Sequence, residues 1–233
     1  MEESVRSPAK TELFERVARV GKAMGHPARL ELLDLLGQGE CPVEPLAAAA
    51  GLRLSTASAH LQVLRRAGLV TTRRVGTSIR YSLAGDDVAT LYATQRAVAA
   101  AHLDDLEPAR RAFLGLTTND PNIDPAVREI SREELLRRVR DGNATVLDVR
   151  PTREYAAGHI PGAISIPADE LADRLAELPA STTVVAYCRG PHCVLSYDAV
   201  RLLTRHGRDA IRLVDGMLEW RLAGHLVARD DAA

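Results

Sequence analysis

Hydrophobic residues recur at helical spacing at the start of this 233-residue chain. Leu13, Val17, Val20 and Met24 are separated by steps of four, three and four residues, which places them on one face of a helix. Two shorter helical segments follow, HPARLELLDLLGQG and VEPLAAAAGL. Pro27 suits the first turn of the earlier segment, and glycines end it. The chain therefore opens with a series of short helices.

The next segment, LSTASAHLQVLRRAG, predicts a fourth helix with Ser55 as its N-cap and Gly68 at its end. The side chains expected to point inward are Leu54, Ala57, Leu61 and Leu64. Two strand-like runs then follow, LVTTRRV and SIRYSLA, and the turn-forming residues between them indicate a β-hairpin. A long amphipathic helix is expected from Asp86 to Phe113.

The pattern changes after a stretch rich in Asn, Asp, Pro, Gly and Thr, GLTTNDPNIDP, which is typical of a linker. The apolar runs ATVLDV, TTVVAY and AIRLV alternate with the helical segments SREELLRRVR, DELADRLAEL and VLSYDAVRLLTRHG, and this alternation predicts a parallel sheet covered by helices. Ser131 with Glu134 forms a capping box, and Gly207 ends the last of these helices. We expect a mainly α winged helix-turn-helix domain at 1–113, a linker at 114–124 and an α/β domain at 125–233.

Composition supports a folded protein, with 46% hydrophobic and 26% charged residues. The N-terminal MEESVRSPAK lacks the apolar core of a signal peptide, and no apolar run approaches the length of a membrane span. Three cysteines, an odd number, argue against a disulfide framework. These features predict a cytoplasmic protein without a membrane partner.

A net charge of −1 conceals a basic block, because six arginines and no acidic residue lie between Gly51 and Gly85. Such a block is the electrostatic signature of a protein that binds a polyanion. The fourth helix is expected in the major groove of double-stranded DNA, with the hairpin on the phosphate backbone. The candidate DNA contacts are Ser55, Thr56, Ser58, His60, Gln62, Arg65, Arg66, Arg73, Arg74 and Arg80.

These segments resemble the ArsR/SmtB family of repressors through the strings LGHPARLxLLxLL, with Met24 for the first Leu, and LAxxxGLxxSTxSxHLxxLxxAGLVxxRRxGxxxxYxL. The resemblance implies a homodimer, paired through the first and last helices, that binds an inverted-repeat operator until an inducer releases it. The family's metal-binding thiols do not carry over, because Pro42 and Glu44 occupy their positions. Asp86 is followed by Asp87 and Val88, so the alternative metal site is also missing its histidine. No metal and no cofactor are expected.

Cys41 lies one position out of register with those thiols. Some members of the family sense reactive sulfur through a cysteine near this position and a second one in the last helix, which has none here. Two interpretations stay open for Cys41: a small buried hydrophobic residue, or a sulfur sensor or relay.

The segment VVAYCRGPHCVLSYDAV contains the other two cysteines, Cys188 and Cys193. A zinc site would need further ligands, and the C-x4-C spacing is not that of a C-x-x-C redox pair. Cysteine phosphatases carry C-x5-R, but the sixth position after Cys188 is Val194. A cysteine between a buried strand and a helix, with Arg189 and Gly190 beside it, favours a nucleophile of lowered pKa in an anion cradle.

The surrounding sequence resembles the rhodanese family, through VLDVRPTREYAAGHIPGAISIP at its start and LVDGMLEWRLAG at its end, where Met217 replaces the usual second Gly. The resemblance implies that Cys188 takes sulfane sulfur from a donor such as thiosulfate, becomes a persulfide and passes the sulfur to a thiol acceptor. The active-site loop would be Cys188, Arg189, Gly190, Pro191, His192 and Cys193, with Cys193 either an accessory thiol or a packing residue. Asp148, Arg150, Glu154 and His159 match the family signature and are interpreted as scaffold.

Together these features predict a homodimeric DNA-binding repressor with a rhodanese-type sulfurtransferase domain that senses or transfers sulfane sulfur. Two alternatives stay open. One is a metal- or metalloid-responsive repressor with a catalytically silent rhodanese fold. The other is a DNA-tethered sulfurtransferase whose turnover is not coupled to DNA binding.

Overall fold

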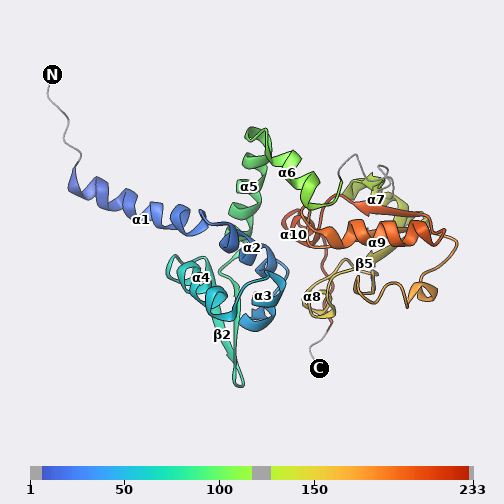
Figure 1. The fold of residues 1–233 in the computed structure, drawn as a ribbon, viewed down its shortest axis with the longest axis horizontal. Helices are drawn as coiled ribbons and strands as arrows, with labels where there is room; N and C mark the ends of the chain where they lie inside the picture. Colours follow the sequence, from blue (N-terminus) through green and yellow to red (C-terminus); the bar gives the residue numbers. More distant parts are fainter. Residues whose placement is uncertain (1–6, 117–126, 231–233) are drawn as a thin grey trace. The chain divides into compact units, whose positions relative to one another are not determined.

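The computed structural model describes residues 7–116 and 127–230. The chain divides into two compact units, Met1–Tyr92 and Ala93–Ala233, and the division falls within helix α5 (Asp86–His102). Each unit is described by itself (Figure 1). Most of the linker expected at 114–124 falls within residues 117–126, which lie outside the described residues, so the domain boundaries at 113 and 125 remain a prediction.

The first unit is a helical domain with a small antiparallel sheet of order β1-β3-β2. Its elements are α1 (Pro8–Met24), α2 (Pro27–Leu36), β1 (Cys41–Pro42), α3 (Val43–Ala49), α4 (Leu54–Arg66), β2 (Val70–Val75) and β3 (Ser78–Leu83), followed by the start of α5. β2 and β3 form the predicted hairpin, in which Val75 is opposite Ser78. This arrangement confirms the winged helix-turn-helix expected from the sequence.

Helix α4 begins earlier than the sequence predicts. Its N-cap is Arg53, whose carbonyl oxygen accepts the Ala57 amide at 3.0 Å, so Ser55 lies within the first turn and is not the cap. Ala57, Leu61 and Leu64 are fully buried, as expected. Leu54 is 49% exposed, which corrects its predicted inward position.

The long helix expected from Asp86 to Phe113 is two helices, α5 and α6 (Leu106–Phe113). Pro108 explains the break, because proline has no amide hydrogen to donate to the carbonyl of Asp104 and its ring clashes with that turn. The chain instead turns at residues 103–105, where the Leu106 amide bonds the Leu103 carbonyl at 3.2 Å.

The second unit contains a five-stranded parallel sheet of order β4-β8-β7-β5-β6, which confirms the predicted α/β fold. Its strands are β4 (Glu129–Ile130), β5 (Ala144–Asp148), β6 (Ile164–Ser165), β7 (Thr183–Tyr187) and β8 (Ala210–Leu213). Its helices, besides the end of α5 and α6, are α7 (Arg132–Arg140), α8 (Thr152–Ala157), the 3-10 helix η1 (Leu175–Glu177), α9 (Val194–Arg205) and α10 (Met217–Leu222).

Both faces of this sheet are buried, as the continuous apolar strand runs predict. Val184 and Ala186 of β7 face a core that includes α9, whereas Val185 and Tyr187 face a core that includes Trp220 of α10. In Figure 1 the long α9 lies along one side of this domain. Because β7 is central and fully covered, its carboxyl end is a rigid support for the residue that follows it, Cys188.

The segment DELADRLAEL is not the α-helix that its sequence predicts. It forms successive turns closed by bonds of three-residue span, such as Arg174 N–H to Leu171 O, and then η1. Leu171 and Leu178 are both buried by this tighter winding. Packing of these two leucines against the sheet therefore overrides local helix propensity. No helix within the described residues is long and apolar enough to cross a membrane.

Candidate functional site

Cys188 directly follows β7 at the carboxyl edge of the parallel sheet, and only 1% of its surface is exposed. Helix α9 begins six residues later, at Val194, so its N-terminus lies close to the sulfur. The Cys188 Sγ lies 3.1 Å from the Ser196 Oγ, and the carbonyl oxygen of Cys193 lies 3.6 Å from the same sulfur. The sequence thus placed the thiol correctly between strand and helix, but it did not identify Ser196 as a neighbour.

The two thiols of the loop have opposite acid–base properties. Burial acts to raise the pKa of Cys188, but hydrogen bonds from Cys193 and Ser196 and the charge of Arg212 outweigh it, and together they lower this pKa to about 7. The hydrogen bond to Cys188, followed by burial, raises the pKa of Cys193 well above its ordinary value. Of the two side chains, Cys188 therefore loses its proton at the lower pH, and Cys193 remains a thiol.

Arg212 is a cationic side chain that lowers the pKa of Cys188, and it was not among the residues predicted from the sequence. It lies on β8, is 1% exposed, and donates from Nε to the Ser196 Oγ at 3.0 Å. Its Nη2 donates to the Gly190 carbonyl at 3.2 Å and its Nη1 to the Glu129 carboxylate at 2.8 Å. The one available signal was an arginine within the apolar run AIRLV, because an arginine in a buried strand requires partners.

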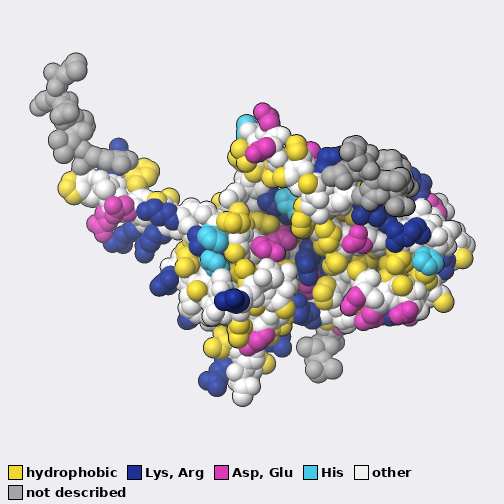
Figure 2. All heavy atoms as spheres, in the orientation of Figure 1, with side chains coloured by type: hydrophobic (Ala, Val, Ile, Leu, Met, Phe, Trp, Pro, Cys, Tyr) yellow, Lys and Arg dark blue, Asp and Glu magenta, His cyan; other side chains and the backbone are white. Residues whose placement is uncertain are grey.

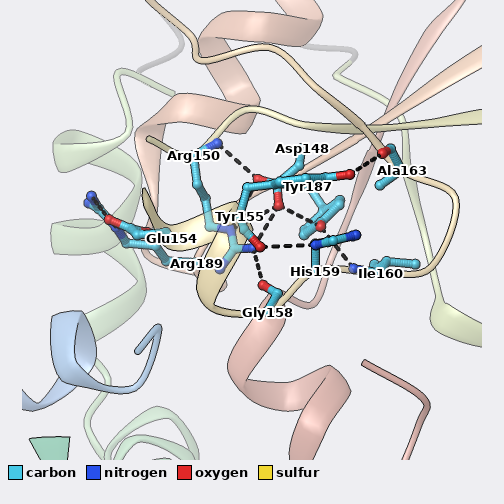
Figure 3. A network of polar contacts seen from close by, with 10 residues as sticks. All are labelled: Asp148, Arg150, Glu154, Tyr155, Gly158, His159, Ile160, Ala163, Tyr187 and Arg189. Carbon is cyan, nitrogen blue, oxygen red and sulfur yellow. Dashed lines mark hydrogen bonds and ion pairs between the residues drawn. The ribbon is translucent and has the colours of Figure 1, made fainter. Parts of the chain in front are cut away.

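The guanidinium of Arg189 is paired with a carboxylate of the protein. It forms an ion pair with the buried carboxylate of Glu154 on α8, with Nη2 to Oε1 at 2.7 Å and Nε to Oε2 at 3.0 Å. Figure 3 shows these two side chains in contact. Arg189 therefore ties the loop to α8, whereas the cationic side chain that lowers the pKa of Cys188 is Arg212.

Gly216 packs directly against the backbone of the Cys188 loop. A Cβ at this position would overlap the backbone at Arg189 and Gly190, so only glycine allows the chain to approach so closely. The amide of the next residue, Met217, donates to the carbonyl of Cys188 at 3.2 Å. The segment LVDGMLEW thus supports the loop by its backbone, although Met217 replaces the second glycine of the family pattern.

The imidazole of His192 lines a cavity of about 420 Å³ in the second unit. Burial, followed by the charges of Arg96 and Arg110, lowers its pKa, so the imidazole is neutral at pH 7. The arginines of this cavity are paired with carboxylates, as in the ion pairs Arg96–Glu219 and Arg110–Glu107. Its charges are therefore largely satisfied within the protein.

The signature residues interpreted as scaffold form a buried network (Figure 3). Asp148 and Arg150 are both fully buried and joined by a 2.6 Å ion pair, and the Tyr187 hydroxyl donates to the same carboxylate at 2.6 Å. Arg150 Nη2 also donates to the Gly158 carbonyl at 2.7 Å. The His159 ring stacks on Tyr155 at 3.7 Å between centroids. These contacts connect β5, β7 and the loop after α8, and none of them touches the Cys188 sulfur.

The candidate DNA contacts lie on α4 and the β2–β3 hairpin of the first unit. Ser55, Thr56, Arg65 and Arg66 are exposed on α4, and Arg73 and Arg74 are exposed on β2. In Figure 2 basic side chains lie beside the hairpin tip. Ser58, His60, Gln62 and Arg80 are only partly exposed.

Four of these candidates have protein partners that the sequence did not reveal. Glu40, just outside the basic block, accepts two hydrogen bonds from Arg73, at 2.8 and 3.0 Å, and lies 3.8 Å from Arg80. Gln62 donates to the Tyr81 hydroxyl at 3.3 Å, which joins α4 to the hairpin. His60 lies 4.5 Å from the His26 ring, and burial, His26 and Arg29 lower its pKa, so it is neutral at pH 7.

Cys41 is 6% exposed and lies on β1, opposite Tyr81 of β3. Tyr81 also contacts Gln62 of α4, so Tyr81 connects the strand of Cys41 to a candidate DNA contact. Among the described residues, no three His, Cys, Asp or Glu side chains are grouped as metal ligands.

The two units thus define a winged helix-turn-helix domain joined to an α/β domain with a cysteine loop at its sheet edge. A Rhodanese-like domain model matches residues 131–223, and a Helix-turn-helix domain model matches residues 24–73. The chain is similar to the HTH-type transcriptional regulator Rv0324 of Mycobacterium tuberculosis, with 53% identity over 218 residues that cover 94% of this chain and 92% of the relative. It is also similar to the HTH-type transcriptional regulator NmtR of Mycobacterium tuberculosis, with 41% identity over 36% of this chain and 71% of that protein.

A solved structure also matches, the homodimeric winged helix-turn-helix DNA-binding domain of Mb0332 from Mycobacterium bovis, with 50% identity and a TM-score of 0.40 over 43% of this chain and 94% of that chain. On the full-length similarity, the chain belongs to the family of HTH-type transcriptional regulators that combine an ArsR-type helix-turn-helix domain with a C-terminal rhodanese-like domain.

Proposed function

We propose that this regulator is a homodimeric repressor whose rhodanese-like domain forms a persulfide on Cys188 and senses or transfers sulfane sulfur. The observation that carries the proposal is the state of Cys188, a buried thiol at the edge of a rhodanese-like sheet with its pKa lowered to about 7. About half of such a thiol is thiolate at neutral pH, and the thiolate is the nucleophilic form.

The proposed first step is attack of the Cys188 thiolate on the outer sulfur of thiosulfate. A bond forms between this sulfur and Sγ, the sulfur–sulfur bond of thiosulfate breaks, and sulfite leaves with the electron pair. The persulfide anion on Cys188 takes up a proton or remains ionised. An acceptor thiolate then attacks the outer sulfur, receives it as a new persulfide and restores the Cys188 thiolate.

On the DNA side, we propose that the exposed residues of α4 read the major groove while the arginines of the hairpin contact phosphates. Ser55 and Thr56 are at the exposed start of α4, where base contacts are expected. Arg65, Arg66 and Arg74 are exposed and available to phosphates. Arg73 and Arg80 must first give up part of their interaction with Glu40.

We further propose that sulfur loading changes DNA affinity through Cys41, which is the one thiol outside the loop. Cys41 lies opposite Tyr81, and Tyr81 contacts Gln62 on α4, so a sulfur added at Cys41 would disturb the junction between the hairpin and the DNA-reading helix.

The test joins two measurements on one sample of full-length protein: intact mass after exposure to thiosulfate or polysulfide, and a DNA mobility shift. We expect a mass gain of one sulfur that the Cys188→Ser variant lacks, together with a change in DNA binding. A mass gain without a change in DNA binding would favour the DNA-tethered sulfurtransferase. If Cys41→Ser responds as fully as the parent, the relay through Cys41 is wrong.

A further inference from the structure

The hydroxyl of Ser196 has a defined hydrogen-bond direction, which Arg212 imposes. Arginine has five N–H donors and no acceptor, so the 3.0 Å contact from Arg212 Nε obliges the Ser196 oxygen to accept. The single proton of the hydroxyl is then free for another acceptor. The Cys188 sulfur, 3.1 Å away, lies within hydrogen-bond distance of that oxygen. A thiolate is an acceptor only, so the hydroxyl donates to it.

Arg212 is itself held in place on every side of its guanidinium. Nη1 donates to Glu129, Nη2 donates to the Gly190 carbonyl, and the group lies 4.3 Å from the centroid of the Tyr197 ring. Tyr197 in turn donates to the same Glu129 carboxylate at 2.8 Å. A guanidinium that is 1% exposed and fixed by these partners cannot rotate away from Ser196. It also fixes the Cys188 loop through the Gly190 carbonyl.

We propose that Ser196 is a catalytic residue that stabilises the Cys188 thiolate by hydrogen bonding, and that Arg212 is the positioning residue that directs the Ser196 proton toward the sulfur. This inference rests on the proposed sulfur chemistry of Cys188 and adds two residues to it, both outside the CRGPHC loop. The pKa of Cys188 agrees with this assignment, since Ser196 and Arg212 are among the groups that lower it.

The experiment measures thiolate formation without requiring any sulfur donor. Full-length protein is alkylated with iodoacetamide across a pH range and digested with trypsin, which places Cys188 in the peptide 175–189 and Cys193 in the peptide 190–201. The alkylation rate of the first peptide gives the pH midpoint of Cys188 alone. In the parent protein we expect this midpoint near pH 7, with reactivity lost as the pH falls below it because the thiolate is protonated.

Ser196→Ala should raise this midpoint by about one pH unit, because the thiolate loses a hydrogen bond that the neutral thiol needs less. Ser196→Thr, which keeps a hydroxyl, should restore most of the parent midpoint. Ser181→Ala is the matched control, since Ser181 is exposed before β7, and it should leave the midpoint unchanged. A parent-like midpoint in Ser196→Ala overturns the role of Ser196.

Arg212→Lys tests the positioning role because it retains the charge but loses the fork that reaches Ser196 and Gly190 together. It should raise the midpoint in the parent, and the shift should be clearly smaller in the Ser196→Ala background, where only the loss of the Gly190 contact remains. Equal shifts in both backgrounds would show that Arg212 does not act through Ser196. A thermal melt of each variant shows whether it is folded. If Arg212→Lys is unfolded, the Ser196 variants alone test the inference.

Sulfur loading of the parent, followed by intact mass, separates this inference from the proposed function. If the parent gains no sulfur while Ser196→Ala raises the midpoint, sulfur transfer fails and the thiolate assignment stands. If the parent gains sulfur while Ser196→Ala changes nothing, the proposed function stands and the inference fails.

Discussion

At the scale of single residues, the environment of Cys188 combines two opposing effects. Complete burial disfavours a negative charge, yet the hydrogen-bonding groups around the sulfur and the cation of Arg212 more than compensate. Because these groups are held by the sheet and by α9, they need not reorganise when the charge forms. A buried thiol whose pKa is nevertheless lowered is consistent with the proposed role of Cys188 as a nucleophile.

Gly216→Ala should abolish most sulfur loading of Cys188. The added Cβ would overlap the backbone at Arg189 and Gly190, so the loop must move and the hydrogen bonds to the sulfur lengthen. We expect a roughly hundredfold lower rate of mass gain with thiosulfate, the order of effect of removing one oriented hydrogen-bond donor. Gly21→Ala is the control, because its Cβ meets nothing within 4 Å on α1. A wild-type rate of sulfur loading in Gly216→Ala would mean that the close contact at Gly216 does not hold the loop in place.

Asp148→Asn should destabilise the rhodanese-like domain by about 3 to 5 kcal/mol, because it leaves the fully buried Arg150 guanidinium without its counter-charge. Burial, with the Asp148 carboxylate next, raises the pKa of Tyr187, so this hydroxyl remains a donor and cannot replace the lost charge.

Urea unfolding of the full-length protein measures the Asp148→Asn effect. Asp198→Asn, which changes an exposed i, i+3 ion pair with Arg201, should cost less than about 1 kcal/mol. Similar losses for the two variants would contradict a structural role for the buried pair.

At the scale of elements, most of the fold was predictable from the sequence. In those elements, the spacing of hydrophobic residues matches the type of element that forms. The run TTVVAY is buried on both faces as β7, and α9 ends before Gly207, which has φ of +72°. The segment DELADRLAEL has an equally good helical pattern, yet it forms turns and a 3-10 helix that bury Leu171 and Leu178. The spacing of hydrophobic residues does not by itself show which backbone conformation will pack them against the core.

The candidate site was predictable only where its residues are consecutive. Cys188 and its loop follow one another in the chain, so strand, loop and helix were visible in the sequence. Ser196 contacts the sulfur from α9 and Arg212 contacts Ser196 from β8, so this second contact joins residues 16 positions apart. Such contacts depend on strand order, which places β8 beside β7. The pairing of Glu40 with Arg73 was missed for the same reason, since it joins β2 to the segment before β1.

Glu40→Gln should tighten DNA binding. The Glu40 carboxylate accepts two hydrogen bonds from Arg73, and it competes with a DNA phosphate for that guanidinium. Removing this charge frees one phosphate contact, so we expect affinity to rise roughly tenfold at low salt and the salt dependence to steepen by about one ion.

A fluorescence anisotropy titration over several salt concentrations measures the Glu40→Gln effect. Glu44→Gln removes the same charge from an exposed position on α3, and it reports the contribution of net charge alone. If both variants bind DNA equally well, the ion pair does not restrain Arg73.

At the scale of the whole molecule, α1 carries an apolar face that the described protomer leaves uncovered. Leu13, Phe14 and Val17 are 59%, 51% and 63% exposed, and only Ala23 and Met24 of this helix are buried. Figure 2 shows hydrophobic side chains open to the surface on this helix. Exposed large apolar residues at helical spacing are typical of an interface. This face therefore supports the proposal that α1 pairs with a second copy of the chain.

Phe14→Asp should dissociate the proposed homodimer. In a symmetric interface each substitution acts twice, and burial of one Phe side chain contributes about 1.5 to 3 kcal/mol, so the dimer dissociation constant should rise by at least about a hundredfold. Analytical ultracentrifugation over a concentration series measures this change. Lys10→Asp, at an exposed polar position of the same helix, is the control and should retain the parent's assembly. DNA affinity should fall when dimerisation is lost, because two recognition helices must bind both halves of an inverted repeat together. A Phe14→Asp protein that remains dimeric would show that α1 does not form the interface.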